Sequence, residues 1–201
     1  YIPCDLMTES VAYDLEYALA DASVALAARS MAASAASDDD AQGYLADAHY
    51  FEERSHSYRN LFDPQMGFIR GKDSRGQFRK EYSPFASLHR KDDYCEGNGW
   101  QYTWLVPHDL EGLVGCFGSR ESFREKLDSL FLVSSELQKG ASADISGLIG
   151  QYAHGNEPSH HILYFYTMLG DQYKCSDLVH EVLTTLYDDT PTGHCGNEDV
   201  G

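Results

Sequence analysis

Two helical stripes in the N-terminal part limit the folds open to this chain. The first lies in an alanine-rich segment that reaches about Ala33, with apolar residues at helical spacing: Val11, Leu15, Ala18, Ala22 and Leu26. An acidic, polar break at Ser37–Asp40 separates it from a second stripe, which comprises Tyr44, Ala48, Phe51, Tyr58 and Phe62. Two long helices joined by a short break predict an antiparallel helical hairpin.

Further helices are predicted after long polar loops. Asp63–Asp93 carries several turn signals and no sustained period, apart from short strands expected around Phe68–Ile69 and Gln77–Phe78. Pro107 is predicted to open a helix, and Ser176 to cap the last one. The pattern indicates an all-α fold of roughly six or seven helices, and no period typical of a solenoid repeat is visible.

Asp144–Gly170 concentrates the polar chemistry of the chain. In its middle, the run HGNEPSHH places imidazole, carboxamide, carboxylate and hydroxyl groups around a predicted helix start. Pro158 suits a first helical position, and Gly170 is placed to end the helix. The positive end of a helix dipole favours a carboxylate such as Glu157. Such a cluster is typical of a site, although each residue alone is also compatible with an ordinary cap.

Charge excludes some classes of partner. The 201 residues carry a formal net charge of −17, which argues against binding to nucleic acid or to anionic membrane surfaces. No apolar run approaches the roughly 20 residues of a membrane span. Hydrophobic residues make up 42% of the chain, which is enough for a sizeable core.

The cysteines do not identify a compartment. Five of them are scattered without paired spacing: Cys4, Cys95, Cys116, Cys175 and Cys195. This is neither a zinc ribbon nor a small disulfide framework. Because the chain begins with Tyr1 and stops inside the run GNEDVG, we expect a single partial domain, residues 1–201, truncated at both ends.

Three glycine-flanked carboxylates point to carbohydrate chemistry. They are Glu96 in EGNGW, Glu157 in GNEP and Asp199 in GNED. Two carboxyl groups on either side of a glycosidic bond can act as acid and as base or nucleophile, and nearby aromatic faces can stack on sugar rings. Trp100 and Trp104 are candidates for such stacking, although two indoles in one loop are more often part of the core.

Metal binding stays open at this level. His154, His160 and His161 could bind zinc, but they lack the HExxH spacing. Asn156 and Glu157 offer oxygen ligands of the kind that calcium takes, without EF-hand spacing.

Taken together, the motifs resemble those of one family. YIPCD, GFIRGKDSRG, EGNGWQYTWLVPHDLEGL, DISGLIGQYAHGNEPSHHILY and GNEDVG occur in this order in the calcium-dependent exo-α-mannosidases of glycoside hydrolase family 92. The resemblance covers essentially the whole chain. It implies a central part of an (α/α)6 barrel (a six-hairpin toroid), with the family's N-terminal β-sandwich domain absent from the chain.

The resemblance also implies roles for individual residues. Glu96 corresponds to the general acid and Asp199 to the general base of an inverting hydrolysis, and Asn156 and Glu157 to a Ca²⁺ site. The remaining pocket residues are implied more loosely: Trp100, Gln101, His154, His160, His161 and Asn197. Many α-1,2-specific relatives carry a His-Glu pair where this chain has Gly140-Ala141. The linkage is therefore open among α-1,2, α-1,3, α-1,4, α-1,6 and a mannosyl phosphodiester.

The sequence thus predicts a secreted, periplasmic or cell-envelope enzyme that removes terminal mannose from glycans. A non-catalytic carbohydrate-binding helical toroid is the main alternative, and the presence of both Glu96 and Asp199 argues against it. A helical scaffold whose polar motifs are only caps and turns is a third interpretation. The oligomeric state is not readable from the sequence.

Overall fold

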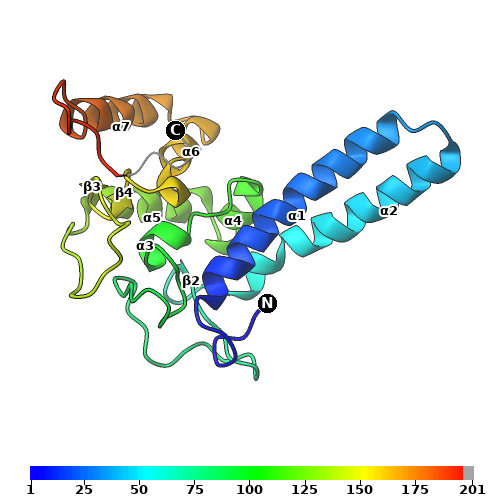
Figure 1. Ribbon diagram of the computed structural model, residues 1–201, viewed down its shortest axis with the longest axis horizontal. Helices are drawn as coiled ribbons and strands as arrows, with labels where there is room; N and C mark the ends of the chain where they lie inside the picture. Colours follow the sequence, from blue (N-terminus) through cyan, green and yellow to red (C-terminus); the bar gives the residue numbers. More distant parts are fainter. Residues whose placement is uncertain (197–201) are drawn as a thin grey trace.

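A long antiparallel helical hairpin forms one arm of the molecule (Figure 1). The computed structural model describes residues 1–196, so Asn197 and Asp199 lie outside the described residues. Helix α1 (Ser10–Ala33) is followed by α2 (Asp38–Ser55). The predicted hairpin is confirmed, but its turn is shorter than expected. Asp38, Asp39 and Asp40 form the first turn of α2, because Ser37 caps that helix by accepting a hydrogen bond from the Asp40 N–H and the helix dipole favours carboxylates there.

The buried face of α1 departs from the predicted stripe in the outer half of the helix. Val11, Leu15 and Ala18 are buried as the stripe predicts, whereas Leu26 is 67% exposed. In the outer half of the helix the buried positions are small residues, among them Ala25, and the two helices are joined there by ion pairs. Arg54 contacts Asp21, and Arg29 contacts Glu52. Small residues let the helix backbones approach closely, which leaves the larger Leu26 side chain on the outside.

After α2 the chain passes through η1 (Ser57–Asn60) and two short paired strands. β1 (Phe62–Asp63) runs antiparallel to β2 (Phe68–Ile69), with Phe62 opposite Ile69. The second helical stripe therefore ends seven residues earlier than the periodicity suggests, at Ser55 rather than Phe62. Residues 70–98 contain no further helix or named strand among the described residues, in agreement with the predicted loop. The strand expected around Gln77–Phe78 is reduced to an isolated antiparallel bridge between Lys72 and Phe78.

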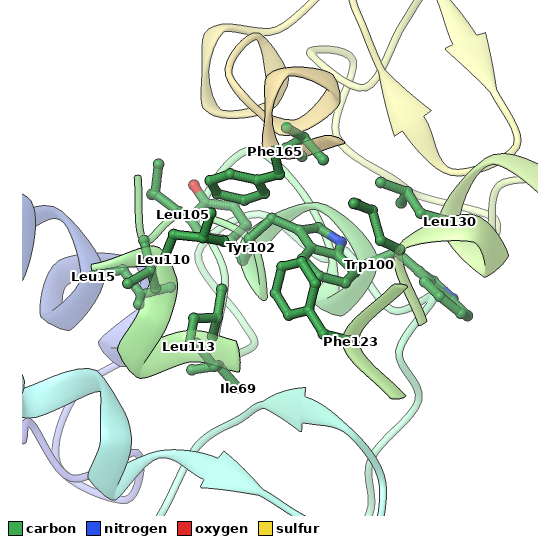
Figure 2. Close-up of a cluster of buried hydrophobic side chains, with 14 of the residues drawn as sticks. Leu15, Ile69, Trp100, Tyr102, Leu105, Leu110, Leu113, Phe123, Leu130 and Phe165 are labelled. Carbon is green, nitrogen blue, oxygen red and sulfur yellow. The ribbon is translucent and has the colours of Figure 1, made fainter. Parts of the chain in front are cut away.

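Three helices in the middle of the chain surround an aromatic core: α3 (Gly99–Tyr102), α4 (Leu110–Cys116) and α5 (Arg120–Leu132). Trp104 is fully buried, stacked on Phe117 at 5.8 Å between ring centroids and edge-on to Phe123 at 5.4 Å. Figure 2 shows neighbouring members of this core, including Trp100, Tyr102 and Phe123. The core interpretation is thus correct for both tryptophans, since Trp100 is buried in the same cluster.

The last part of the chain is less regular than predicted. It contains β3 (Leu148–Ile149), β4 (Tyr152–Ala153), η2 (Glu157–Ser159), η3 (Ile162–Tyr164), α6 (Phe165–Met168) and α7 (Gln172–Thr185). Pro158 opens a single 3₁₀ turn rather than a continuous helix, but Gly170 ends α6 with a φ of 90° as predicted. Helix α7 starts four residues before Ser176. Within residues 1–196, no helix is long and apolar enough to cross a membrane.

Candidate active site

Glu96 stands at the entrance to α3, in a segment held by a capping box. The Asn98 side chain accepts a hydrogen bond from the Trp100 N–H at 2.9 Å, and the Asn98 N–H donates to Gln101 Oε1 at 2.7 Å. The Glu96 N–H donates to the Tyr102 hydroxyl at 3.3 Å. These bonds satisfy the free donors at the helix start and fix the direction in which Glu96 leaves the backbone.

The glycines of EGNGW are required by crowding. A Cβ at Gly97 would lie 2.8 Å from the ring of Tyr102, and one at Gly99 would collide with the hydroxyl of Tyr82. Neither collision is with the tip of a flexible aliphatic chain, so a substitution would displace the segment that carries Glu96.

The fold brings Glu96 against the GNEP run, sixty residues further along the chain. The Asn156 side chain is 3% exposed, and its Nδ2 donates to the Glu96 carbonyl at 3.0 Å. Burial raises the pKa of the Glu96 carboxyl, a hydrogen bond from Asn156 opposes this, and the charges of Asp144, Glu157 and Glu16 raise it further. The result is a half-buried carboxyl that holds its proton to higher pH than a free glutamate does.

Asn156 and its neighbours present oxygen donors that the protein itself does not use. Among the described residues, the Asn156 Oδ1 and the Ser159 hydroxyl are buried without a hydrogen-bond partner. The adjacent Glu157 is half-buried. A buried, unpartnered carboxamide oxygen beside a carboxylate suits a hard cation such as calcium. The donor set therefore fits the ion that the family resemblance implies.

Gly196, the first residue of the GNED run, lies against the segment that carries Gly147 and Gly155. A Cβ at Gly155 would lie 3.0 Å from Gly196 Cα, and one at Gly147 would lie 2.7 Å from Cys195 Sγ. Gly196 directly precedes Asn197, so the described chain ends beside GNEP. The positions of Asn197 and Asp199 themselves are not described.

The three histidines divide between two environments. His154 lies between two phenols, with Nδ1 2.9 Å from the Tyr152 hydroxyl and Nε2 2.9 Å from the Tyr187 hydroxyl. His160 is exposed, and its Nε2 donates to the His154 carbonyl at 2.9 Å. His161 instead donates from Nε2 to the Trp104 carbonyl at 2.6 Å and packs edge-on against a core phenylalanine. Burial lowers the pKa of both His154 and His161, which keeps the two rings neutral at pH 7.

Trp100 and Gln101 are buried in α3, directly after the segment that carries Glu96. Trp100 is 7% exposed and packs edge-on against Phe68 at 4.9 Å between ring centroids, with the Lys126 ammonium over its indole. Gln101 is buried, and its Nε2 donates to the Gln151 carbonyl at 2.6 Å. In this structure both residues are occupied by protein contacts, and their contact with sugar stays a prediction.

A cavity of about 180 Å³ adjoins Glu96, lined by Glu9, Ala12, Tyr13, Glu16, Cys95, Glu96 and Tyr102. The sequence analysis did not select Glu9, Tyr13 or Glu16, because α1 is far from Glu96 in sequence. It also missed Gln151, which is fully buried and bonded to Asn98 through Oε1 at 3.0 Å. The sequence around Gln151 does not indicate this role, because the residue lies in the short turn between β3 and β4.

Comparison with known proteins decides the family. The model of the glycosyl hydrolase family 92 catalytic domain matches residues 1–201. The chain belongs to glycosyl hydrolase family 92. It is 38% identical to the family 92 α-mannosidase BT3965 of Bacteroides thetaiotaomicron, whose structure is known in complex with mannoimidazole, with a TM-score of 0.86 over 99% of this chain and 25% of that one.

Two further proteins extend the comparison. The inverting mannosidase BT2199 of Bacteroides thetaiotaomicron is 31% identical, with a TM-score of 0.76 over 99% of this chain and 26% of that one. An uncharacterized secreted glycosidase of Arthroderma benhamiae is 25% identical over the whole chain and 25% of its own length. The chain thus spans about a quarter of the length of these relatives. Its mostly helical architecture matches the corresponding part of the two solved mannosidases.

Proposed function

We propose that this chain is part of an exo-acting α-mannosidase that releases terminal α-linked mannose from glycans with inversion of configuration. Membership of family 92 and the similarity to solved α-mannosidases support the reaction class. The observation that carries the proposal is the environment of Glu96: a half-buried carboxyl with a raised pKa, tied through Asn156 to the GNEP segment.

Glu96 is assigned as the general acid. A glycosidic oxygen is a poor leaving group unless it receives a proton as the bond breaks, and a carboxyl with a raised pKa is protonated in a larger fraction of molecules near neutral pH. The three acidic neighbours that raise the pKa also favour return of the proton after each turnover. The capping box keeps the carboxyl at a fixed position relative to the sugar.

Asp199 is assigned as the general base, with Asn197 beside it. An inverting mechanism needs this second carboxyl roughly 6.5–9.5 Å from the first, so that a water molecule fits between carboxylate and sugar. Gly196, whose backbone abuts Gly155, places the described end of the chain next to the GNEP segment.

Asn156 and Glu157 are assigned as ligands of a calcium ion. When bound, calcium supplies positive charge that orients sugar hydroxyls and water. The unpartnered Asn156 Oδ1 supports this assignment. Trp100, Gln101, His154, His160 and His161 are proposed to bind the mannose, either directly or by supporting groups that do. The neutral state of His154 and His161 suits hydrogen bonding to hydroxyl groups. A secreted, periplasmic or cell-envelope location is proposed with this function, supported by the similarity to a secreted glycosidase.

Mannose release from a panel of α-linked mannobioses by the full-length protein that contains this chain tests the proposal, first with calcium and then with a chelator. We expect release that stops with the chelator and returns with calcium, and β-mannose as the first product by NMR. The preferred disaccharide would show what Gly140-Ala141 means for linkage. Mannose binding by the folded protein without release from any linkage would refute the proposal in favour of a carbohydrate-binding toroid.

A further inference from the structure

A second group of potential metal ligands lies beside the cavity of Glu96. The side chains of Glu9, His89 and Cys95 converge from the start of α1 and from one loop, and one ligand atom of each lies within 4.8 Å of the other two. Glu9 immediately precedes α1, His89 lies in the long loop, and Cys95 directly precedes Glu96. This cluster is distinct from Asn156 and Glu157.

The spacing within the cluster is close to what a small tetrahedral cation needs. Glu9 Oε1 lies 3.4 Å from His89 Nδ1, and Cys95 Sγ lies 4.0 Å from the same nitrogen. With zinc bonds of about 2.0 Å to oxygen and nitrogen and 2.3 Å to sulfur, tetrahedral geometry places such pairs about 3.3 Å and 3.5 Å apart. The oxygen–nitrogen distance already fits, and the nitrogen–sulfur distance has to shorten by about half an ångström.

We propose that Glu9, His89 and Cys95 form a binding site for a thiophilic divalent cation of the zinc class. A thiolate, an imidazole and a carboxylate are the ligands that zinc takes, and three protein ligands leave a fourth position open to water. Calcium prefers six or more oxygen ligands and is a poor match for this set. The proposal does not depend on the mannosidase function, because metal binding is measured directly.

The electrostatic environment favours a cation at this position. Burial raises the pKa of the Cys95 thiol to about 11, with further contributions from Glu9, Glu96 and Asp144. The same negative charges attract a metal ion, which takes the thiolate sulfur while the thiol proton leaves to the buffer. The coordinated cation would join the start of α1, the long loop and the segment that carries Glu96.

Without a metal, the His89 and Glu9 side chains are held by hydrogen bonds to backbone groups of the loop. His89 Nδ1 lies 2.9 Å from the Cys95 carbonyl, and the Arg90 N–H donates to Glu9 Oε1 at 2.7 Å. Coordination through Nδ1 replaces the first of these bonds and requires the tautomer with the proton on Nε2. The second bond can persist, because a carboxylate oxygen has more than one lone pair.

Cobalt titration of the calcium-saturated protein tests the site. We expect a thiolate-to-cobalt charge-transfer band of one equivalent, lost on adding zinc. The band should disappear in Cys95→Ser, and cobalt affinity should fall by more than about tenfold in His89→Ala and Glu9→Gln, since losing a ligand costs at least as much as losing a group that merely supports one. Cys116→Ser is the matched control, because it removes another half-buried free thiol outside the cluster.

Zinc should also raise the thermal midpoint of the wild-type protein and of Cys116→Ser, but not that of Cys95→Ser. If Cys95→Ser does not fold, His89→Ala decides, because the His89 ring is 44% exposed and its removal leaves the core intact. No charge-transfer band, a band that survives in Cys95→Ser, or a cobalt affinity unchanged in His89→Ala would overturn the proposal and leave a hydrogen-bonded cluster.

Discussion

Replacing Gln151 with leucine is expected to loosen the segment that carries Glu96. Gln151 is fully buried, and its side chain joins two parts of the chain that meet at the site. Its Oε1 accepts from Asn98 Nδ2 at 3.0 Å, and its Nε2 donates to the Ser134 carbonyl at 2.7 Å. Leucine has a similar volume but neither hydrogen-bonding group, so the substitution removes both bonds while filling most of the space.

The expected loss of stability follows from the hydrogen-bonding groups that the substitution leaves without a partner. Asn98 is fully buried, and its amide would lose its partner, whereas the exposed Ser134 can turn to water. A lost hydrogen bond costs about 1 kcal/mol, and an unsatisfied buried donor costs about 1–3 kcal/mol, so the free energy of unfolding should fall by about 2–4 kcal/mol. Because Asn98 caps the helix that follows Glu96, kcat should fall by about tenfold to a hundredfold, as expected for a misplaced catalytic group.

Denaturant unfolding and steady-state kinetics measure the two effects. The matched control is Gln138→Leu, because Gln138 is exposed and makes one side-chain bond, to Ser83 at 3.1 Å. Its unfolding free energy should change by less than about 0.5 kcal/mol. A Gln151→Leu protein that matches this control in both stability and kcat would refute the idea that Gln151 positions the site.

Three further outcomes are expected. Glu157→Gln should weaken calcium binding, measured by calorimetry, because it removes a carboxylate charge from the proposed ligand set; unchanged affinity would exclude Glu157 as a ligand. Glu96→Gln should raise the thermal midpoint at neutral pH, because the pKa of Glu96 is raised in the folded state. This gain in thermal midpoint should vanish as the pH falls below the pKa of Glu96 in the unfolded chain. A gain that is constant with pH would contradict this prediction. Burial would raise the pKa of Asp109, but hydrogen bonds from Tyr58, Arg59 and the Gly112 N–H hold this pKa below its usual range. Asp109→Asn should therefore lower the free energy of unfolding at neutral pH and lower it progressively less in acid. A loss of stability that does not depend on pH would refute this.

Sequence periodicity was a good guide where contacts are local. The α1–α2 hairpin was predictable because each helix has its own apolar stripe. The end of α6 at Gly170 was predictable because glycine readily adopts the left-handed conformation that ends a helix. Periodicity was a poor guide where tertiary contacts determine the local structure. The Asp144–Gly170 stretch has helical spacing after Pro158 but forms short 3₁₀ turns, because its polar groups bond to distant partners such as the Trp104 and Glu96 carbonyls.

The candidate site was predictable in its polar motifs and not in its supports. Glu96, Asn156 and Glu157 stood out because glycines flank them. Their meeting in space depends on Gln151 and on the start of α1, which a single sequence does not connect to Glu96. Likewise, Leu26 fitted the stripe on α1 but is exposed, because small residues face α2 instead.

Leaving-group dependence of Glu96→Gln tests the central assignment most directly. An acid matters most when the departing oxygen is basic. We therefore expect Glu96→Gln to lose most of its kcat/KM on mannobiosides and much less on mannosides with an activated aryl leaving group, relative to wild type. Equal losses on the two kinds of substrate would contradict the assignment of Glu96 as the general acid.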